Sequence, residues 1–321
     1  MTLLDVRPLW PYRLPASGGP DGVSRVLGGV YERLLCVDGA PIVVRAWEER
    51  RDQIVRIAAV PAAPWMPVGA QSEELGLEAS QEKLEIAAAR VRHALGVDDD
   101  YREFFAAFRG DRLLAPAFHR LAHVRVRRTP WPWEALAWAV TEQLIEETRA
   151  RQIQRRIVRG RAAFVELPPD RRRLWDVPDA DAFAAMAPAE LAAFDLAPKR
   201  ALAMIRIARE VALGRCDLDD PGDDRRLLAI PDIGPWTVQV LRLKGRGEAD
   251  SLPAGDLAYI KLVGVLAGLG RRATVAEVEE FFAPYAPFRG LAGLFSLIAY
   301  SHRVREAGPQ RLAPDAWPDA A

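Results

Sequence analysis

Cysteine is scarce in this chain of 321 residues, which holds only Cys36 and Cys216. Two thiols cannot form a disulfide scaffold, a four-cysteine zinc site or a four-cysteine iron–sulfur cluster. The sequence also lacks an apolar run of about 18 residues, the length that a membrane-spanning helix requires. The segment from Met1 to Arg13 meets proline and charge too early for a signal peptide. These absences predict a cytoplasmic protein without a membrane partner.

Lysine is rare as well, because only 4 of the 44 basic residues are Lys and the other 40 are Arg. With 44 acidic residues the net charge is zero, which gives no general attraction to nucleic acid. The arginines are nevertheless clustered. Residues 148–161 contain six Arg and no acid, and residues 119–128 contain four Arg, two His and no acid. Such stretches fit either a phosphate contact or a solvated helix face, and composition alone favours the solvated face.

The first part of the chain is rich in strand patterns. Residues Tyr31–Val37 and Ala40–Trp47 flank the pair Asp38-Gly39, which is a strong signal for a two-residue hairpin turn. Alternating apolar residues continue over Gln53–Val60, and a proline-rich loop is expected over Val60–Val68. These patterns predict an antiparallel sheet in a small N-terminal α+β domain.

The rest of the chain has helical periodicity. We predict a mainly α fold in which the α+β domain, residues 1–80, precedes two helical lobes. One lobe comprises residues 81–130 plus 250–321, and the other comprises residues 131–249. The predicted helices are 84–95, 101–108, 134–144, 149–158, 183–186, 189–194, 200–211, 225–230, 257–266, 275–282 and 291–305. A groove between two such lobes is a common place for a ligand.

The stretch around residues 225–245 carries the strongest local signal for a binding site. A short helix over Arg225–Ile230 is followed by the tight turn Pro231–Gly234, and Pro235 then opens a second helix. Such a turn directs free backbone N–H groups outward at one point, where a phosphate fits without any base being read. The predicted phosphate-binding residues of this hairpin are Ile233, Gly234, Trp236 and Thr237.

This segment resembles the helix-hairpin-helix motif, and the residues that follow make the resemblance more specific. A Gly/Pro-rich loop, Leu252–Leu257, carries Asp256 about twenty residues past the hairpin, which is the signature of the helix-hairpin-helix (HhH-GPD) DNA glycosylase superfamily. Further similar segments are Pro132–Leu136 with Gln143-Leu144, Leu196–Ala201 and Pro287–Ala292. Together with the N-terminal sheet, they resemble the bacterial DNA-3-methyladenine glycosylase II family.

The resemblance implies that Asp256 is catalytic. Cleavage of an N-glycosidic bond builds positive charge on the deoxyribose, and an ionised carboxylate close to the sugar stabilises that charge. The carboxylate would also orient the attacking water. The competing interpretation is that Asp256 only caps the helix Leu257–Leu266. Both roles are compatible, because a helix N-terminus favours the ionised form.

The resemblance also implies a wedge that fills the gap left by a flipped base. Leu144 is the candidate wedge, and Gln143 is expected to contact the orphaned base. From periodicity alone Leu144 would be one more core leucine. Glu146 and Glu147 follow where the family usually has a small polar residue, and two acids are unusual beside DNA.

Trp236 and Tyr259 are the candidate walls of the base pocket. An electron-poor alkylated purine stacks well on aromatic rings through cation–π attraction. In the resembling family, lyase-active enzymes carry a Lys at the position of Trp236, where its amine forms a Schiff base with the sugar. Lys244 lies about two helical turns further on. These residues predict a monofunctional glycosylase, although Trp236 would also fit as a packing residue.

Partners and cofactors follow from the same resemblance. The expected partner is double-stranded DNA that contains damaged bases, bound by a monomer associated with the nucleoid. No cofactor is expected, except a Na⁺ or K⁺ ion held by the backbone carbonyls of Leu228, Ile230 and Ile233. Two alternatives stay open at this point: an 8-oxoguanine-type DNA glycosylase, which Trp236 disfavours, and a non-catalytic helix-hairpin-helix DNA-binding protein.

Overall fold

The computed structural model describes residues 1–62, 79–167 and 171–307, with side chains up to residue 302. The loop predicted over Val60–Val68 lies mostly outside these residues. The strands are β1 (Thr2–Val6), β2 (Ser24–Leu27), β3 (Val30–Val37), β4 (Ala40–Glu49), β5 (Ile54–Pro61), β6 (Phe164–Leu167) and β7 (Arg172–Trp175).

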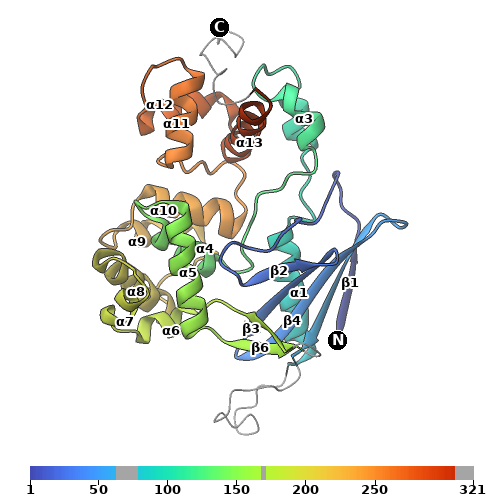
Figure 1. The fold of residues 1–321 in the computed structure, drawn as a ribbon, viewed down its shortest axis with the longest axis vertical. Coiled ribbons are helices and arrows are strands. Elements are labelled where there is room, and N and C mark those ends of the chain that lie inside the picture. Colours follow the sequence, from blue (N-terminus) through green and yellow to red (C-terminus); the bar gives the residue numbers. More distant parts are fainter. Residues whose placement is uncertain (63–78, 168–170, 308–321) are drawn as a thin grey trace.

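The helices follow the sheet along the chain, and a short β-hairpin interrupts them (Figure 1). They are α1 (Gln81–Leu95), α2 (Arg102–Ala107), α3 (Ala115–Leu121), α4 (Pro132–Glu142), α5 (Glu147–Arg161), α6 (Ala180–Ala185), α7 (Pro188–Ala193), α8 (Pro198–Ala212), η1 (Pro221–Asp223), α9 (Asp224–Leu228), α10 (Pro235–Val240), the π-helical turn η2 (Leu241–Arg246), α11 (Leu257–Leu266), α12 (Val275–Phe282), η3 (Ala283–Tyr285) and α13 (Arg289–Ala307). The mainly helical class with a small N-terminal antiparallel sheet is therefore confirmed.

The N-terminal sheet is built around the hairpin that the sequence predicts. Its strand order is β1-β5-β4-β3-β2, and all neighbouring strands are antiparallel. Asp38 and Gly39 have φ values of 44° and 77°, and the flanking Val37 pairs with Ala40. Two positive φ values match the twist of the strands, which explains the Asp-Gly pair. The outer strands β1 and β2 were not predicted, because four or five residues give little periodicity. The turn after β2 did carry a signal, since Gly28 and Gly29, with φ values of 57° and 79°, separate the paired residues Leu27 and Val30.

Helix α1 packs on this sheet. Its buried residues Leu84, Ala88 and Val91 share one core with Ile42 and Ile57 of the strands. This core continues to Val97, just past the left-handed C-cap at Gly96. The domain boundary predicted at residue 80 therefore cuts through a single core. The error arose because amphipathic spacing identifies an apolar helix face without identifying the surface that covers it.

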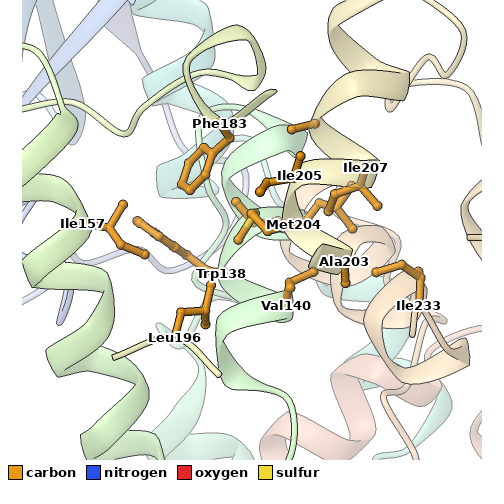
Figure 2. Packing of buried hydrophobic residues seen from close by; sticks show 14 of the residues in the cluster. Trp138, Val140, Ile157, Phe183, Leu196, Ala203, Met204, Ile205, Ile207 and Ile233 are labelled. Atoms are coloured by element: carbon orange, nitrogen blue, oxygen red, sulfur yellow. The ribbon is translucent and has the colours of Figure 1, made fainter. Parts of the chain in front are cut away.

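Two further hydrophobic cores lie among the helices. The first spans residues 135–241 and gathers helices α4 to α10, with Trp138, Phe183 and Met204 near its centre (Figure 2). The second combines residues 101–126 with residues 243–299 and includes a cluster of aromatic rings around Phe104. Helices α3, α11, α12 and α13 form this group at one end of the molecule (Figure 1).

The structure adds elements to this helical region that the sequence did not reveal. Helix α3 and the hairpin β6–β7 were not predicted. No single helix in the described ranges is long and apolar enough to cross a membrane; α12 with η3 and α13 pass that test only together, across a bend of 105°.

A buried ion cluster joins the sheet to the helices. Arg33 on β3 is 2% exposed, and its Nη2 lies 2.6 Å from Oε2 of Glu134 on α4 and 3.4 Å from Oδ1 of Asp176 after β7. Oδ2 of Asp176 accepts a hydrogen bond from the backbone N–H of Cys36. Burial raises the pKa of Glu134 to about 7, although the charge of Arg33 opposes this shift. One guanidinium therefore serves two buried carboxyl groups.

Replacement of Arg33 by Met should be strongly destabilising. Removal of one partner of a buried ion pair leaves the other charge without compensation and typically costs about 3–5 kcal/mol. The measurement is the free energy of unfolding from urea denaturation at pH 7. The matched control is Arg56→Met, which breaks a half-exposed pair with Asp5 and should cost at most about 1 kcal/mol. Equal losses in the two variants would contradict the role assigned to the cluster.

Candidate functional site

The predicted segment of two helices joined by a tight turn, over residues 225–245, is present. Helix α9 ends at Leu228, and α10 begins at Pro235 with Gly234 as its N-cap residue. Asp232 is exposed and has a φ of 68°, a left-handed conformation that Asp tolerates better than most residues. Ile233 anchors the turn, since its side chain is 5% exposed and packs in the first helical core (Figure 2). The side chain of Ile233 thus anchors the turn to this core.

The backbone of this turn offers donors to a ligand. The N–H groups of Ile233 and Thr237 bond to the carbonyls of Ile230 and Gly234. In the described part of the chain, no acceptor lies against the backbone N–H of Gly234 or of Trp236. Gly234 and Trp236, on either side of Pro235, thus have free N–H groups at a helix start, which suit an anion such as a phosphate, whereas the N–H groups of Ile233 and Thr237 are already used.

The corner between α4 and α5 touches this turn. Nε2 of Gln143 donates to the carbonyl of Asp232 and to Oγ1 of Thr237, each at 3.0 Å. Leu144 follows with a φ of 54° and a fully exposed side chain, 103% of the reference value. Leu144 is therefore not a core leucine. Helix α4 ends at Glu142, two residues earlier than predicted, and the left-handed backbone projects Leu144 away from the protein.

Two of the three acidic residues beside Leu144 lie near basic side chains, whereas the exposed Glu146 forms no ion pair within the described ranges. Oε2 of Glu142 lies 3.8 Å from Nζ of Lys244, and Oε1 accepts a hydrogen bond from Gln154. Glu147 forms an ion pair with Arg151 one turn along α5. Lys244 is consequently engaged with Glu142.

Asp256 caps helix α11. Its Oδ1 accepts a hydrogen bond of 2.8 Å from the backbone N–H of Ala258, so the capping interpretation is correct for this oxygen. Oδ2 has no hydrogen-bond partner among the described residues, and the side chain is half-buried. One oxygen is therefore held in place while the other is available to a ligand.

Trp236 lies next to the loop that carries Asp256. A Cβ atom added to Gly255 would be 3.6 Å from Cβ of Trp236. The half-buried indole has its Nε1 out of contact with solvent, and no described residue supplies an acceptor. A buried N–H without a partner is uncommon in folded proteins and is often found at functional sites.

Tyr259 is deeper in the molecule than predicted for a wall of an open pocket. Its side chain is 5% exposed, and its ring packs edge-on against Phe282 in the second helical core. Its pKa is raised, chiefly by burial and secondarily by the nearby negative charge of Asp256. Tyr259 is thus a buried residue in the first turn of α11, and Asp256 is the N-cap residue of the same helix.

The sequence analysis missed the contacts that fix the position of the Asp256 loop. Nε of Arg289 donates to Oδ1 of Asp250 at 2.9 Å, and Leu291 N–H bonds to the carbonyl of Ala249. A Cβ at Gly290 would lie 2.4 Å from the carbonyl oxygen of Ser251, so only glycine fits here. The sequence analysis did single out the Pro287–Ala292 segment. It could not show that this segment contacts residues 249–251, because the two are distant in sequence.

The backbone carbonyls predicted to hold a monovalent cation, those of Leu228, Ile230 and Ile233, are not all free of hydrogen bonds. The carbonyl of Ile230 accepts the N–H of Ile233 at 3.1 Å, which leaves one lone pair. No cluster of three or more His, Cys, Asp or Glu side chains that could hold a metal occurs in the described ranges. A backbone-held cation remains a prediction.

Comparisons with known proteins identify relatives that share sequence with the chain. No protein-family profile matches it. The chain is 24% identical over 221 residues to a DNA-3-methyladenine glycosylase of Bacillus subtilis, covering 67% of this chain and 72% of that protein. It is 28% identical over 230 residues to a probable bifunctional transcriptional activator/DNA repair enzyme AlkA of Mycobacterium tuberculosis, covering 70% of this chain but only 45% of the relative.

Several solved structures have a fold similar to that of this chain. A 3-methyladenine DNA glycosylase from Archaeoglobus fulgidus superposes with a TM-score of 0.74 at 20% identity, over 94% of this chain and 99% of that one. A Clostridium acetobutylicum 8-oxoguanine glycosylase/lyase bound to double-stranded DNA gives 0.68 at 13% identity, over 95% and 99%. The resemblance to the helix-hairpin-helix glycosylases is confirmed, and the fold is theirs.

Truncation of Leu144 to Ala should leave stability almost unchanged. The side chain is fully exposed, so its loss creates no cavity, and the free energy of unfolding should change by less than about 0.5 kcal/mol. Leu136→Ala on the same helix is the control. Leu136 is 0% exposed, and its truncation should cost about 2–5 kcal/mol. Urea denaturation of both variants makes the comparison, and a similar loss in both would place Leu144 in the core after all.

Proposed function

We propose that this chain, which has the fold of the helix-hairpin-helix DNA glycosylases, removes alkylated purines from double-stranded DNA and leaves an abasic site. The observation that carries the proposal is Asp256. Its carboxylate is half-buried, has one oxygen fixed by the α11 cap and the other free, and stands beside an indole with an unpartnered N–H. The names of the relatives support the same activity.

The proposed chemistry needs an ionised Asp256 close to the sugar. As the bond between the sugar and the base lengthens, positive charge develops on the deoxyribose, and the free Oδ2 stabilises it electrostatically. The same oxygen would orient a water molecule for attack at the anomeric carbon. The departing base takes the bonding electrons, and its existing positive charge makes an alkylated purine a better leaving group than an intact one.

The proposed binding mode uses the corner around Leu144. The two helical groups, each with its own core, would act as lobes, and the duplex would lie across the hairpin with one phosphate on the N–H groups of Gly234 and Trp236. Leu144 would enter the base stack where the damaged nucleotide is flipped out. Because Gln143 is bonded to the hairpin, movement of the wedge and of the phosphate contact would be coupled. A Na⁺ or K⁺ ion on the hairpin carbonyls and action as a monomer in the cytoplasm belong to the same proposal.

Trp236 supports a purine glycosylase without lyase activity. The indole would present its face to a cationic base, while no amine occupies its position. Lys244, the nearest lysine along the chain, is held by Glu142. An 8-oxoguanine glycosylase/lyase shares the fold at lower similarity, so the position of Trp236 rather than the fold separates the two activities.

Asp256→Asn should abolish most base release while DNA binding persists. Loss of a preorganised electrostatic contact of this kind typically lowers the rate about 10²–10³-fold. Asn caps a helix about as well as Asp, so folding should survive. The assay measures free alkylated bases released from methylated duplex DNA. Asp179→Asn is the matched control, because Asp179 caps α6 through the same kind of bond at 2.8 Å. Near-normal excision by Asp256→Asn would remove this carboxylate from the mechanism.

Borohydride should trap no covalent complex between the protein and DNA. Without an amine nucleophile no imine forms with the sugar, so the product should be an intact abasic site. The measurement is a denaturing gel of a reaction run with borohydride, and a lyase-active glycosylase serves as the positive control. Efficient trapping by the present protein would assign it to the lyase class.

A further inference from the structure

A cleft lies on the side of helix α5 that faces the hairpin β6–β7, and its lining does not include Asp256. Its volume is about 310 Å³, and its lining comes from three separate elements and the segment before β2. The charged lining residues are Asp21, Arg25, Arg155, Arg159 and Arg173, and Trp175 supplies an aromatic wall. None of these residues belongs to the site proposed for base excision.

Four arginines in this cleft face a single lining carboxylate. That carboxylate, Asp21, is 7% exposed and is already used: one oxygen accepts the N–H of Val23, and the other accepts Nε1 of Trp138 at 2.9 Å. Asp21 therefore serves the interior of the protein. It offsets only part of the positive charge in the cleft.

The nearest other carboxylates are shared among several arginines. Glu32 accepts hydrogen bonds from Arg25 and Arg45 and lies 3.5 Å from Arg172. Glu166 pairs with both Arg171 and Arg173. The side chains of Glu32 and Glu166 are only 5% and 8% exposed, so these acids sit behind the guanidinium groups. The surface that a ligand would meet is consequently cationic.

Individual donors in the cleft lack acceptors. Nη2 of Arg25 is buried and has no hydrogen-bond partner in the described ranges. Nε of Arg155 donates to the carbonyl of Pro20, and neither Nη atom of Arg155 has a hydrogen-bond partner within the described ranges. Arg159 makes no ion pair with any described residue. A buried guanidinium N–H without an acceptor is energetically costly and indicates that an anion completes the site.

Two of the arginines in the cleft, Arg155 and Arg159, come from the arginine-rich segment 148–161. Four of its six arginines pair with acids of the protein: Arg149 and Arg156 with Asp195, Arg151 with Glu147, and Arg161 with Glu190. The other two, Arg155 and Arg159, are four residues apart on one helix face and both line the cleft. The interpretation of residues 148–161 as a solvated helix face therefore does not account for Arg155 and Arg159, which line the cleft.

We propose that this cleft binds the phosphate group of a small phosphorylated molecule. Planar guanidinium groups bind phosphate oxygens in a bidentate manner, and four of them match a multiply charged phosphate better than a carboxylate. The volume is at the lower end of the range for small-ligand pockets. The donors lie in a concave site, one of them buried, where a small anion fits better than the convex backbone of a duplex. The proposal does not depend on the glycosylase function.

The test measures binding of inorganic pyrophosphate by isothermal titration calorimetry at low chloride. The full chain should bind about one pyrophosphate, and Arg155→Gln/Arg159→Gln should weaken that binding about tenfold or more through lost charge-assisted hydrogen bonds. The control is Arg206→Gln/Arg209→Gln, which removes the same charge from exposed positions of helix α8. It should change binding less than about twofold. Melting temperatures of both variants establish that they are folded.

Three outcomes would overturn the proposal. The first is no saturable pyrophosphate binding by the unmodified protein, and the second is an equal loss in the control variant, which would indicate general charge attraction. The third comes from a parallel titration with an undamaged 24-base-pair duplex. If the cleft variant binds this duplex more weakly than the control does while pyrophosphate binding is unchanged, the cleft is an extra DNA contact. Excision assays are not used, so failure here leaves the glycosylase proposal untouched.

Discussion

The buried guanidinium of Arg33 connects the parts of the chain that position the candidate site. It lies on the N-terminal sheet and bonds to Glu134, in the first turn of α4, and to Asp176, after the hairpin β6–β7. Because α4 is rigid and buried over most of its length, the orientation set at Glu134 is transmitted to its other end, where Gln143 and Leu144 stand. The N-terminal sheet therefore helps to determine the position of Leu144.

The candidate site itself is assembled where the two helical cores meet. Gln143 bonds to the hairpin of the first core, and Trp236 at the start of α10 packs beside Gly255 in the loop that leads to α11 of the second. Arg289 fixes the other side of that loop through Asp250. The loop that leads to Asp256 is thus contacted from both sides. Such support limits the positions that the carboxylate can take.

A net charge of zero conceals an uneven distribution of charge. Many acids in the described ranges are engaged by basic side chains: around α5, Glu142 pairs with Lys244, Glu147 with Arg151 and Asp195 with Arg149. The cleft at Arg155 and Arg159 is an exception, because its arginines outnumber the carboxylates available to them. Local excess of one sign, rather than net charge, decides where an anion binds.

Local chemistry in the sequence determined the hairpin at Asp38-Gly39, most helices, the turn before Pro235 and the cap at Asp256, because each depends on neighbouring residues alone. Tertiary structure decided the rest. Periodicity could not show that α1 covers the sheet, that Leu144 is exposed or that Tyr259 is buried, since each depends on distant packing. Nor could composition sort six arginines of α5 into four that pair with acids and two that face a cleft. Asp195 and Glu190, which pair with three of these arginines, and Arg25 and Arg173, which line the cleft with Arg155 and Arg159, are brought near only when the chain folds.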